Sequence, residues 1–178
     1  GREGQVSDAS ATLVFAIEEG RKLKLQAVGF EVNVHFTDEE LAEQVKTKPK
    51  FLKVFRKKFD VDQFKKDQEA LSLHYQRHGF LEAKVTEGSR KLVADDKRLD
   101  VNFQIGEGPQ YKLGKIVIEG ATTFSRSDLV YPITVQPGDV LNRPQLIGDL
   151  QEVRSLYWNQ GYRRVDIEPE IIPDRETG

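Results

Sequence analysis

Histidine side chains are the first candidates for chemistry, because the chain has three of them and no cysteine. His74 and His78 lie four residues apart, a spacing that puts both on one face of a helix and could hold zinc. No carboxylate occupies the position that an HExxH motif requires, and His35 is distant in the sequence. We therefore interpret all three as surface or helix-end histidines, and we predict no metal site and no cofactor.

Two further motifs resemble parts of active sites. Gly106 and Gly108 could begin a phosphate-binding loop, but Pro109 and a strand-like stretch follow them, whereas such a loop needs a helix. Asp95 and Asp96 could bind a metal or act in catalysis, but they fall in an expected hairpin loop, where a solvated turn is the simpler interpretation. The sequence has no nucleophile elbow with a matching histidine and aspartate. We predict that the chain is not an enzyme and has no catalytic residue.

Basic residues are concentrated in one lysine-rich segment, which a repeat described below marks as an insertion. A solvated loop between two helices is one interpretation of the segment. A docking patch for an acidic partner or for lipid headgroups is the other. The candidate patch consists of Lys46, Lys48, Lys50, Lys53, Arg56, Lys57 and Lys58, and Lys65 and Lys66 follow it.

Length and composition limit the class of protein. A chain of 178 residues suits one domain or two small ones, and 38% hydrophobic with 31% charged residues is typical of a soluble, ordered chain. A formal net charge of −2 gives no general attraction to nucleic acid or anionic lipid. No apolar run approaches the roughly 18 residues of a membrane-spanning helix. The lack of cysteine is compatible with an oxidising compartment.

An internal repeat organises the chain. Residues 13–30 recur as residues 101–118, at a spacing of 88. In both copies a Glu-Gly pair, Glu19-Gly20 or Glu107-Gly108, separates two stretches of alternating apolar residues, and this alternation predicts strands. After the lysine-rich segment the spacing falls to 82. The pairs at that spacing include Tyr75 with Tyr157, Gly79 with Gly161, and Phe80 with Tyr162.

Four helix starts share one capping pattern, in which a polar cap residue precedes a residue that can reach back to it. The cap residues are Thr37, Asp60, Ser125 and Asn142. Strands are predicted over residues 12–17, 23–30, 81–86, 99–105, 111–118 and 163–172. The aromatic residues Tyr75, Phe80, Tyr157 and Tyr162 are predicted to lie in the cores.

Each repeat therefore follows the order β-α-α-β-β, and we predict an α+β fold of tandem modules. In each module two helices pack on one face of a small three-stranded mixed sheet, which leaves an open edge. Residues 1–18 should be the last strand of a preceding module, residues 19–106 a complete module, and residues 107–178 a second module without its final strand. Because the chain starts and ends within a repeat, we expect it to be a fragment of a longer protein.

Three motifs resemble POTRA domains, the polypeptide-transport-associated repeats of outer-membrane assembly and transport proteins (the BamA/TamA-like family). These motifs are Tyr75-x-x-x-Gly79-Phe80, the turn Glu107-Gly108-Pro109-x-Tyr111 and the strand Ile116-x-Ile118-x-Gly120. The first motif recurs at residues 157–162, so the resemblance covers about residues 11–178. Two departures stand out. The first copy has Gly29-Phe30-Glu31 where the second has Ile118-Glu119-Gly120, and the second lacks its closing strand.

The resemblance implies a location in the periplasm, as part of an outer-membrane protein of a Gram-negative-type cell. The implied partners are unfolded outer-membrane proteins, accessory assembly lipoproteins and a membrane-embedded β-barrel of the same parent chain. Clients would bind by β-augmentation, adding a strand to the open edge formed by the strand after the second helix. The implied edge residues are Leu81, Glu82, Ala83, Lys84, Val85 and Thr86, with Arg163, Arg164, Val165, Asp166 and Ile167 in the second module. The implied inter-module hinge comprises Gly106, Glu107, Gly108, Pro109 and Tyr111.

Several alternatives stay open. The modules could act as a spacer with hinge-controlled orientation, or belong to a two-partner secretion transporter. A nucleic-acid-binding KH fold would need Gly-x-x-Gly between its helices, and residues 46–59 contain no glycine, so we predict no nucleic-acid partner. Residues 12–17 of one molecule could also complete the second module of another, which would give a strand-exchanged oligomer.

Overall fold

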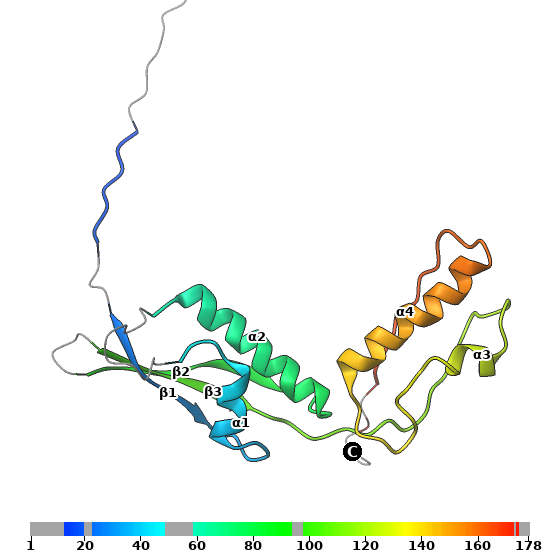
Figure 1. Ribbon diagram of the computed structural model, residues 1–178, viewed down its shortest axis with the longest axis horizontal. Coiled ribbons are helices and arrows are strands. Elements are labelled where there is room, and N and C mark those ends of the chain that lie inside the picture. Colours follow the sequence, from blue (N-terminus) through cyan, green and yellow to red (C-terminus); the bar gives the residue numbers. More distant parts are fainter. Residues whose placement is uncertain (1–12, 20–22, 49–58, 94–97, 173, 175–178) are drawn as a thin grey trace, which may run out of the picture.

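The computed structural model describes residues 13–19, 23–48, 59–93, 98–172 and 174. Figure 1 shows the elements of this part of the chain in two groups joined by an extended segment. In chain order the elements are β1 (Lys24–Glu31), α1 (Asp38–Gln44), α2 (Val61–Arg77), β2 (Lys84–Val93), β3 (Arg98–Gly106), α3 (Arg126–Val130) and α4 (Arg143–Asn159). We refer to the group from β1 to β3 as the first module and to residues from 107 onward as the second module. The predicted boundaries themselves stay a prediction.

The first module contains a three-stranded sheet in the order β1-β3-β2. β1 runs parallel to β3, with Phe30 opposite Phe103, and β2 runs antiparallel to β3, with Val85 opposite Ile105. The last strand in the sequence is therefore the central strand of a mixed sheet. This arrangement confirms the predicted α+β fold class.

The helices begin where the capping pattern predicts. Thr37 and Ser125 form capping boxes, in which the hydroxyl accepts the amide hydrogen three residues later and the carboxylate at that position accepts the amide hydrogen of the cap. Asp60 and Asn142 cap α2 and α4 with side-chain oxygens. These local hydrogen bonds satisfy backbone donors that a helix leaves free at its start.

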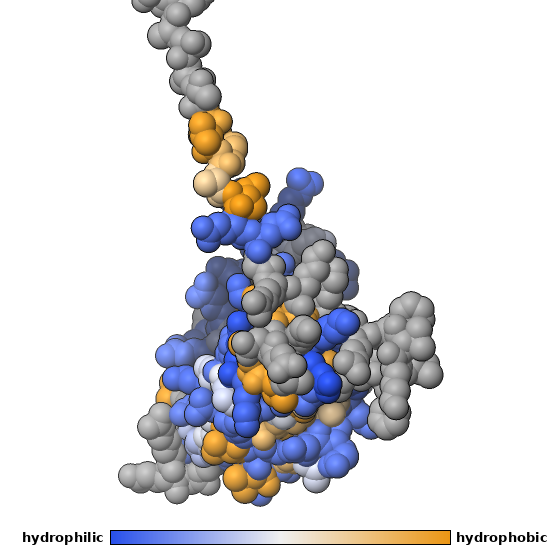
Figure 2. Space-filling model, turned by 90° about the vertical axis from the view of Figure 1, so that its left-hand side faces the viewer, coloured by the Kyte–Doolittle hydropathy of each residue, from blue (hydrophilic) through white to orange (hydrophobic). Residues whose placement is uncertain are grey.

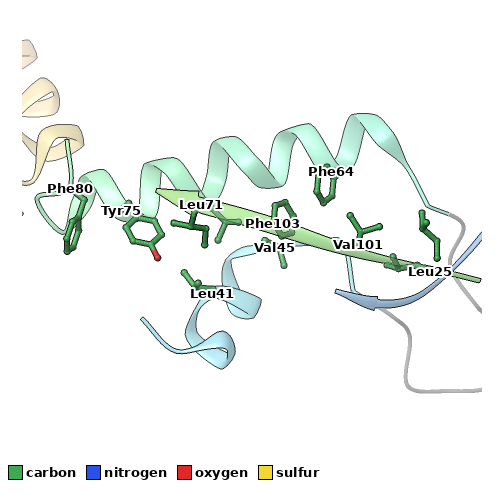
Figure 3. Close-up of a cluster of buried hydrophobic side chains, with 11 residues drawn as sticks. Leu25, Leu41, Val45, Phe64, Leu71, Tyr75, Phe80, Val101 and Phe103 are labelled. Carbon is green, nitrogen blue, oxygen red and sulfur yellow. The ribbon is translucent and has the colours of Figure 1, made fainter. Parts of the chain in front are cut away.

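One hydrophobic core joins the helices of the first module to its sheet (Figure 3). Phe64 of α2 stacks on Phe103 of β3, with ring centroids 4.3 Å apart. Leu41 of α1 and Leu71 of α2 are fully buried in the same cluster. Because both helices contribute to one core, both cover the same face of the sheet, as predicted.

A buried carboxylate occupies the equivalent position of the long helix in both modules. Asp67 of α2 accepts hydrogen bonds from the backbone amides of Lys46 and Thr47, at 3.0 and 2.7 Å. Asp149 of α4 accepts bonds from the amide and the hydroxyl of Thr134, at 2.8 and 2.7 Å. In each module the carboxylate ties the long helix to the segment that follows the short helix. The sequence repeat therefore corresponds to a repeated structural device.

The second module differs from the prediction in its strands. No regular strand is assigned within the described residues of 107–174, where the only ladder contact is an isolated bridge between Lys112 and Val140. The predicted strands over 111–118 and 163–172 are thus wrong as regular strands. In the first module, the corresponding segments both pair with β3. No strand in the described part of the second module occupies that central position, so neither segment can pair with a central strand there.

Residues 13–17 also form no strand, although a strand over 12–17 was predicted; residue 12 lies outside the described part. Their side chains are exposed. Figure 1 shows this segment extending away from the first module. All five residues are apolar, with the larger Leu13, Phe15 and Ile17 at every second position. Such a segment becomes a strand only when a neighbour pairs with it.

The predicted core aromatics agree with the structure in part. Tyr75 and Phe80 are buried, and Tyr157 packs against the core of the second module. Tyr162, in contrast, is 45% exposed, and its hydroxyl lies 2.8 Å from that of Thr123. Phe80 is covered by the aromatic rings around it, which include His35, whereas Tyr162 has a ring contact with Tyr157 alone among the described residues.

Two further findings concern membrane-spanning helices and the predicted hairpin loop. No helix in the described ranges is long and apolar enough to cross a bilayer. The predicted hairpin residues Asp95 and Asp96 lie outside those ranges.

Candidate functional site

The outer side of β2 has no neighbouring strand in the part of the chain that the structure describes. β2 pairs with β3 on one side only, so its other side presents backbone N–H and C=O groups at a free edge. β1 forms the second edge of the sheet. The edge of β2 is the better candidate for binding, because a groove runs beside it.

That groove lies between α2 and β2 and has a volume of about 420 Å³. Gln68 reaches across it, and its Nε2 donates a 3.5 Å hydrogen bond to the carbonyl oxygen of Val85. Leu73 is 40% exposed and supplies an apolar spot. The groove is lined by Lys65, Gln68, Glu69, Ser72, Leu73, Gln76 and Val85. Its polar walls and apolar spot could take one apolar side chain of a strand paired with β2.

The predicted edge residues of the first module divide between a turn and the strand. Lys84, Val85 and Thr86 lie in β2. Residues 81–83 precede it and form tight turns, in which the amide of Leu81 donates to the carbonyl of Gly79 at 3.0 Å. The expected strand therefore begins three residues later than predicted, because the left-handed Gly79 (φ +86°) that ends α2 turns the chain first.

A β-bulge divides β2 into two straight runs. The pairing register with β3 shifts between Glu87 and Arg90, beside Gly88. A Cβ atom on Gly88 would lie 3.1 Å from the carbonyl oxygen of Asn102, so a side chain there would crowd β3. A bulge bends a strand and interrupts its ladder. The run Lys84–Glu87 is thus the straight part of the edge that lies next to the groove.

The predicted edge of the second module is not a strand. Arg163, Arg164 and Asp166 are exposed, and Val165 and Ile167 are half-buried. Ile167 packs against the core of the second module. The segment therefore lies in the expected place without the expected conformation.

The basic patch lies largely outside the described residues. Lys50, Lys53, Arg56, Lys57 and Lys58 fall there, and only Lys46 and Lys48 are described. The amide of Lys46 donates to Asp67, so this end of the segment is anchored to α2. The docking role of the patch stays a prediction.

Glu107 joins the end of β3 to the loop between β1 and α1. One of its oxygens, Oε1, accepts hydrogen bonds from the amides of Val34 and His35 at 2.7 and 3.0 Å. The same oxygen accepts the hydroxyl of Tyr75 at 3.0 Å. Its Oε2 lies 2.5 Å from Nδ1 of His35. Four groups from two parts of the first module thus converge on one carboxylate.

The electrostatics of this cluster favour an ionised Glu107. Burial raises the pKa of its carboxyl, but the hydrogen bonds from His35, Val34 and Tyr75 outweigh burial and hold that pKa below its ordinary value. Burial and the carboxylate of Glu107 together raise the pKa of Tyr75 well above its ordinary range. Tyr75 therefore acts as a hydrogen-bond donor and Glu107 as an acceptor.

Tyr111 anchors the segment after Glu107 to the turn that follows α2. Its amide donates to the carbonyl of Gly79 at 2.9 Å, and its hydroxyl donates to Glu82 at 2.9 Å. Its carbonyl in turn accepts the amide of Leu141 in the second module, at 2.9 Å. Arg143 of α4 adds a 3.3 Å bond to Gln76 of α2. The predicted hinge region is thus a hydrogen-bonded junction between the modules.

Sequence reasoning named Glu107 only as part of a hinge and missed its role as a buried acceptor. The available signal was the recurrence of a Glu-Gly pair at the same place in both copies, Glu19-Gly20 and Glu107-Gly108. The Glu107 partners Val34 and His35 lie more than 70 residues away in the sequence, and Tyr75 lies 32 residues away. A local motif could flag the residue but could not find those partners.

His74 and His78 lie together near the end of α2, with ring centroids 4.6 Å apart. Nδ1 of His78 is 2.8 Å from the carbonyl oxygen of His74, and the ring of Phe36 packs edge-on against both histidines. Within the described ranges no group of three or more potential ligands could hold a metal ion. Burial, with the neighbouring His78 and Arg77, lowers the pKa of His74, which favours its neutral form. The pair therefore serves as packing at the end of α2.

Comparison with known families gives two matches. The POTRA family, described as "surface antigen variable number repeat", matches residues 23–108 and again residues 111–178. The outer membrane protein assembly factor BamA of Neisseria meningitidis serogroup B is 24% identical over 165 residues. A putative outer membrane protein assembly factor of Treponema pallidum is 26% identical over 170 residues. Each alignment covers 90% of this chain, which spans about a fifth of the length of each relative (21% and 20%).

Solved structures share the fold. POTRA domains 3–5 of BamA from Haemophilus influenzae superpose with a TM-score of 0.60 and 22% identity, covering 76% of this chain and 54% of that one. POTRA domains 1–2 of Omp85 from Anabaena superpose with a TM-score of 0.55 and 17% identity, covering 85% of this chain and 90% of that one. The resemblance read from Tyr75, Gly79, Glu107 and Tyr111 is confirmed. Because the family pattern matches twice and together spans most of the residues, this chain belongs to the POTRA family.

Proposed function

We propose that this chain is a periplasmic segment of an outer-membrane protein assembly protein, and that it binds unfolded client strands by β-augmentation at the edge of β2. The names of the Neisseria and Treponema relatives support the first part of the proposal. The parent protein would carry a membrane-embedded β-barrel and recruit accessory lipoproteins. The role is recognition without catalysis.

The observation that carries the proposal is the free edge of β2 beside an open groove. A client strand can pair with the backbone of Lys84–Glu87 without displacing any strand in the described residues. It needs only to replace the long 3.5 Å bond between Gln68 and Val85. Backbone pairing reads little of the client's side chains, which suits a receptor for many clients.

The groove also indicates which strands fit. Successive side chains of a paired strand point to opposite faces of the sheet, so every second client residue would face α2. Leu73 and Val85 offer an apolar surface there, and Lys65 and Glu69 offer charged rims. Membrane β-strands alternate apolar and polar residues, which matches a groove on one face and solvent on the other.

A matched pair of variants tests the groove. Leu73→Lys places a charge in the groove, whereas Ile147→Lys changes a residue of nearly equal exposure on α4 (40% against 39%) that lies outside it. The probe is a fluorescently labelled peptide of about nine residues with alternating apolar and polar side chains. We expect Leu73→Lys to weaken its binding about tenfold, because about 1.4 kcal/mol of apolar contact is lost. Ile147→Lys should bind as the parent does.

Circular dichroism of both variants provides the folding control. Equal weakening by the two substitutions, with folding intact, would mean that the groove has no special part in binding. No binding of the peptide to the unmodified chain at millimolar concentration would contradict the proposal as a whole.

A spacer role is the second candidate, and the junction favours it. Glu107 and Tyr111 are buried and hydrogen-bonded on both sides of the connection between the modules. Such a connection could fix the orientation of one module relative to the other, and so position a client that binds at another site of the parent protein. Under this alternative, Leu73→Lys would leave assembly function unchanged in cells, whereas variants of the junction would impair it.

A further inference from the structure

Glu87 and Arg90 form an ion pair on the edge strand β2, just beyond the groove. Nη2 of Arg90 donates a 2.7 Å hydrogen bond to Oε2 of Glu87, and Nε of Arg90 contacts Oε1. One guanidinium thus engages both carboxylate oxygens, an arrangement that fixes the plane of the guanidinium. The side chain of Arg90 is nevertheless 41% exposed.

The β-bulge beside Gly88 places this ion pair on the face of the sheet that α2 covers. Side chains alternate between the two faces of a regular strand, so residues three apart would point in opposite directions. The bulge adds one residue, and Glu87 and Arg90 therefore lie opposite Phe103 and Val101, which are both buried in the core. Because a side chain at position 88 would crowd β3, glycine permits the bulge and with it the ion pair.

One face of the Arg90 guanidinium is covered by an aromatic ring. Its Cζ lies 5.1 Å from the ring centroid of Phe59, the residue that precedes the cap of α2. Phe59 packs in turn on Phe64, with ring centroids 5.6 Å apart, and its amide donates a 3.4 Å hydrogen bond to the carbonyl of Leu23. The cation is thus held against an anchored ring on one face and a carboxylate along one edge.

The ion pair and the groove lie on the same face of the same edge. Val85, which lines the groove, and Glu87 both lie opposite buried residues of β3, so both point to the face that α2 covers. Directly opposed residues of neighbouring strands share a face. A client strand paired with Lys84–Glu87 would therefore place one side chain beside Val85 and, two residues along, another beside Glu87. Arg90 is a diagonal neighbour of that second side chain, a separation that an aromatic side chain can bridge.

The ion pair lies toward the end of the first module that faces away from the second. Figure 1 shows α2 beginning and β2 ending there. Figure 2 views the molecule from that end, where most of the described surface is hydrophilic and apolar side chains show between hydrophilic ones. Because Arg90 is exposed, a client side chain can reach it without moving any part of the core.

We propose that Arg90 binds an aromatic side chain of the client, two residues away from the apolar side chain that occupies the groove. The client ring stacks on the guanidinium face opposite Phe59, so that the cation lies between two rings. Arginine suits this role because its guanidinium is planar and weakly hydrated. Glu87 already supplies a carboxylate to Arg90 and would repel a second one, so an aromatic ring is favoured over an acidic side chain.

This inference rests on the proposed pairing of a client with β2 and adds the class of side chain that the client carries. Membrane β-strands have apolar residues at every second position and aromatic residues at the two ends of the apolar band. The end of such a strand presents an aliphatic and an aromatic residue two positions apart. It therefore matches both the groove and Arg90.

The first test compares phenylalanine with cyclohexylalanine, which is of similar size and apolar but has no aromatic ring. Labelled alternating peptides carry a single leucine and, two positions to either side of it, one or the other residue, so that the direction of the bound strand does not matter. We expect the phenylalanine peptide to bind the unmodified chain about two- to fivefold more tightly, the range of an exposed cation–π contact. In Arg90→Gln this preference should disappear.

Lys91→Gln is the matched control, because it removes the same charge from the next residue of β2, which points to the other face. It should keep the preference for phenylalanine. Thermal unfolding shows whether both variants are folded. NMR of the unmodified chain gives a second measurement that needs no variant. The ring current of the phenylalanine peptide should shift the Nε–H signal of Arg90 more than the cyclohexylalanine peptide does.

Two results would overturn the role of Arg90 and leave client pairing with β2 in place. One is equal binding of the two peptides to the unmodified chain, together with equal shifts of the Arg90 signal. The other is a preference for phenylalanine that persists in folded Arg90→Gln. If neither peptide binds the unmodified chain at millimolar concentration, the role of Arg90 and the proposed function are overturned together.

Discussion

At the scale of single residues, the carboxylate of Glu107 links the residue after β3 to α2 and to the loop between β1 and α1. Its carboxylate accepts hydrogen bonds from Val34, His35 and Tyr75, and its side chain is only 7% exposed. A buried acceptor with this many donors is costly to neutralise, because the donors would be left without full partners.

Replacing this carboxylate should therefore lower stability in a pH-dependent way. We expect Glu107→Gln to reduce the free energy of unfolding by about 1–3 kcal/mol at pH 7. The folded state lowers the pKa of Glu107 from its ordinary value of 4.5. The ionised form thus favours folding; its contribution is complete above about pH 4.5 and is lost as the pH falls through the lowered value. The difference between parent and variant should shrink accordingly at pH 3.

Urea unfolding at pH 7 and pH 3 measures the free energy of unfolding of the parent and of the variant at each pH. Glu19→Gln is the control, because Glu19 holds the equivalent repeat position but is exposed. It should leave the free energy of unfolding unchanged. A loss for Glu107→Gln that is the same at both pH values would contradict the role of the ionised carboxylate.

At the scale of elements, the link between β1 and α1 contains a strained residue that the second module avoids. Val32 has φ +67°, in the left-handed region that β-branched residues rarely adopt. Its counterpart at the spacing of 88 is Gly120, with φ +75°. The same turn is thus made by valine in one copy and by glycine in the other.

Exchanging these residue types should move stability in opposite directions. We expect Val32→Gly to stabilise the first module by about 1 kcal/mol, because the left-handed penalty exceeds the entropy cost of glycine. Gly120→Val should destabilise the second module, although no atom lies within 4 Å of the added Cβ. Thermal unfolding of both variants checks this pair. A lower melting temperature for Val32→Gly would show that the backbone there is not strained.

The helices and strands also show how much of the fold could be predicted from the sequence. The starts of α1 and α2 were predictable, because caps such as Thr37 and Asp60 act on their own neighbours. The strands predicted at β1 and β3 do form, because the two segments pair with each other. The segment 163–172 has comparable alternation but no partner strand among the described residues, and alternation alone does not make a strand.

The candidate site was predictable only in outline. The topology predicted an open edge, the family resemblance implied that the strand after α2 forms it, and β2 is such an edge in the described part of the chain. The groove beside it, with Leu73 exposed and Gln68 reaching Val85, depends on how far α2 stands from β2. That distance follows from side-chain packing across the whole module. The partners of Glu107 were hidden for the same reason, since only the fold brings His35 to it.

At the scale of the whole molecule, Gly79 fixes the contact between the two modules. It ends α2 with φ +86°, and a Cβ there would lie 2.7 Å from the carbonyl oxygen of Tyr111 and 2.9 Å from Val140. Gly161 ends α4 with nearly the same backbone, φ +88°, but nothing lies within 4 Å of its Cβ position. The two glycines are alike locally and differ only in what surrounds them.

Substituting alanine at each of these two glycines separates the strain of a positive φ from the crowding at the junction between the modules. We expect both Gly79→Ala and Gly161→Ala to cost about 1 kcal/mol, because alanine is strained at positive φ. Only Gly79→Ala should also displace the second module, since the new methyl group meets the carbonyl oxygen of Tyr111 and the side chain of Val140. Residual dipolar couplings report the angle between the modules. An unchanged angle in Gly79→Ala, or an equal change in both variants, would argue against a tightly packed junction.

The central claim is that a client strand pairs with the backbone of β2, and one NMR titration tests it most directly. The isotopically labelled chain is titrated with an alternating peptide and with two versions of it, N-methylated at odd or at even positions. We predict that the parent peptide shifts the amide signals of Lys84–Glu87. One methylated version should lose this effect and the other should keep it, because only every second amide of a strand faces its neighbour. Equal behaviour of the two versions, or shifts confined to other residues such as Lys46 and Lys48, would contradict β-augmentation at this edge.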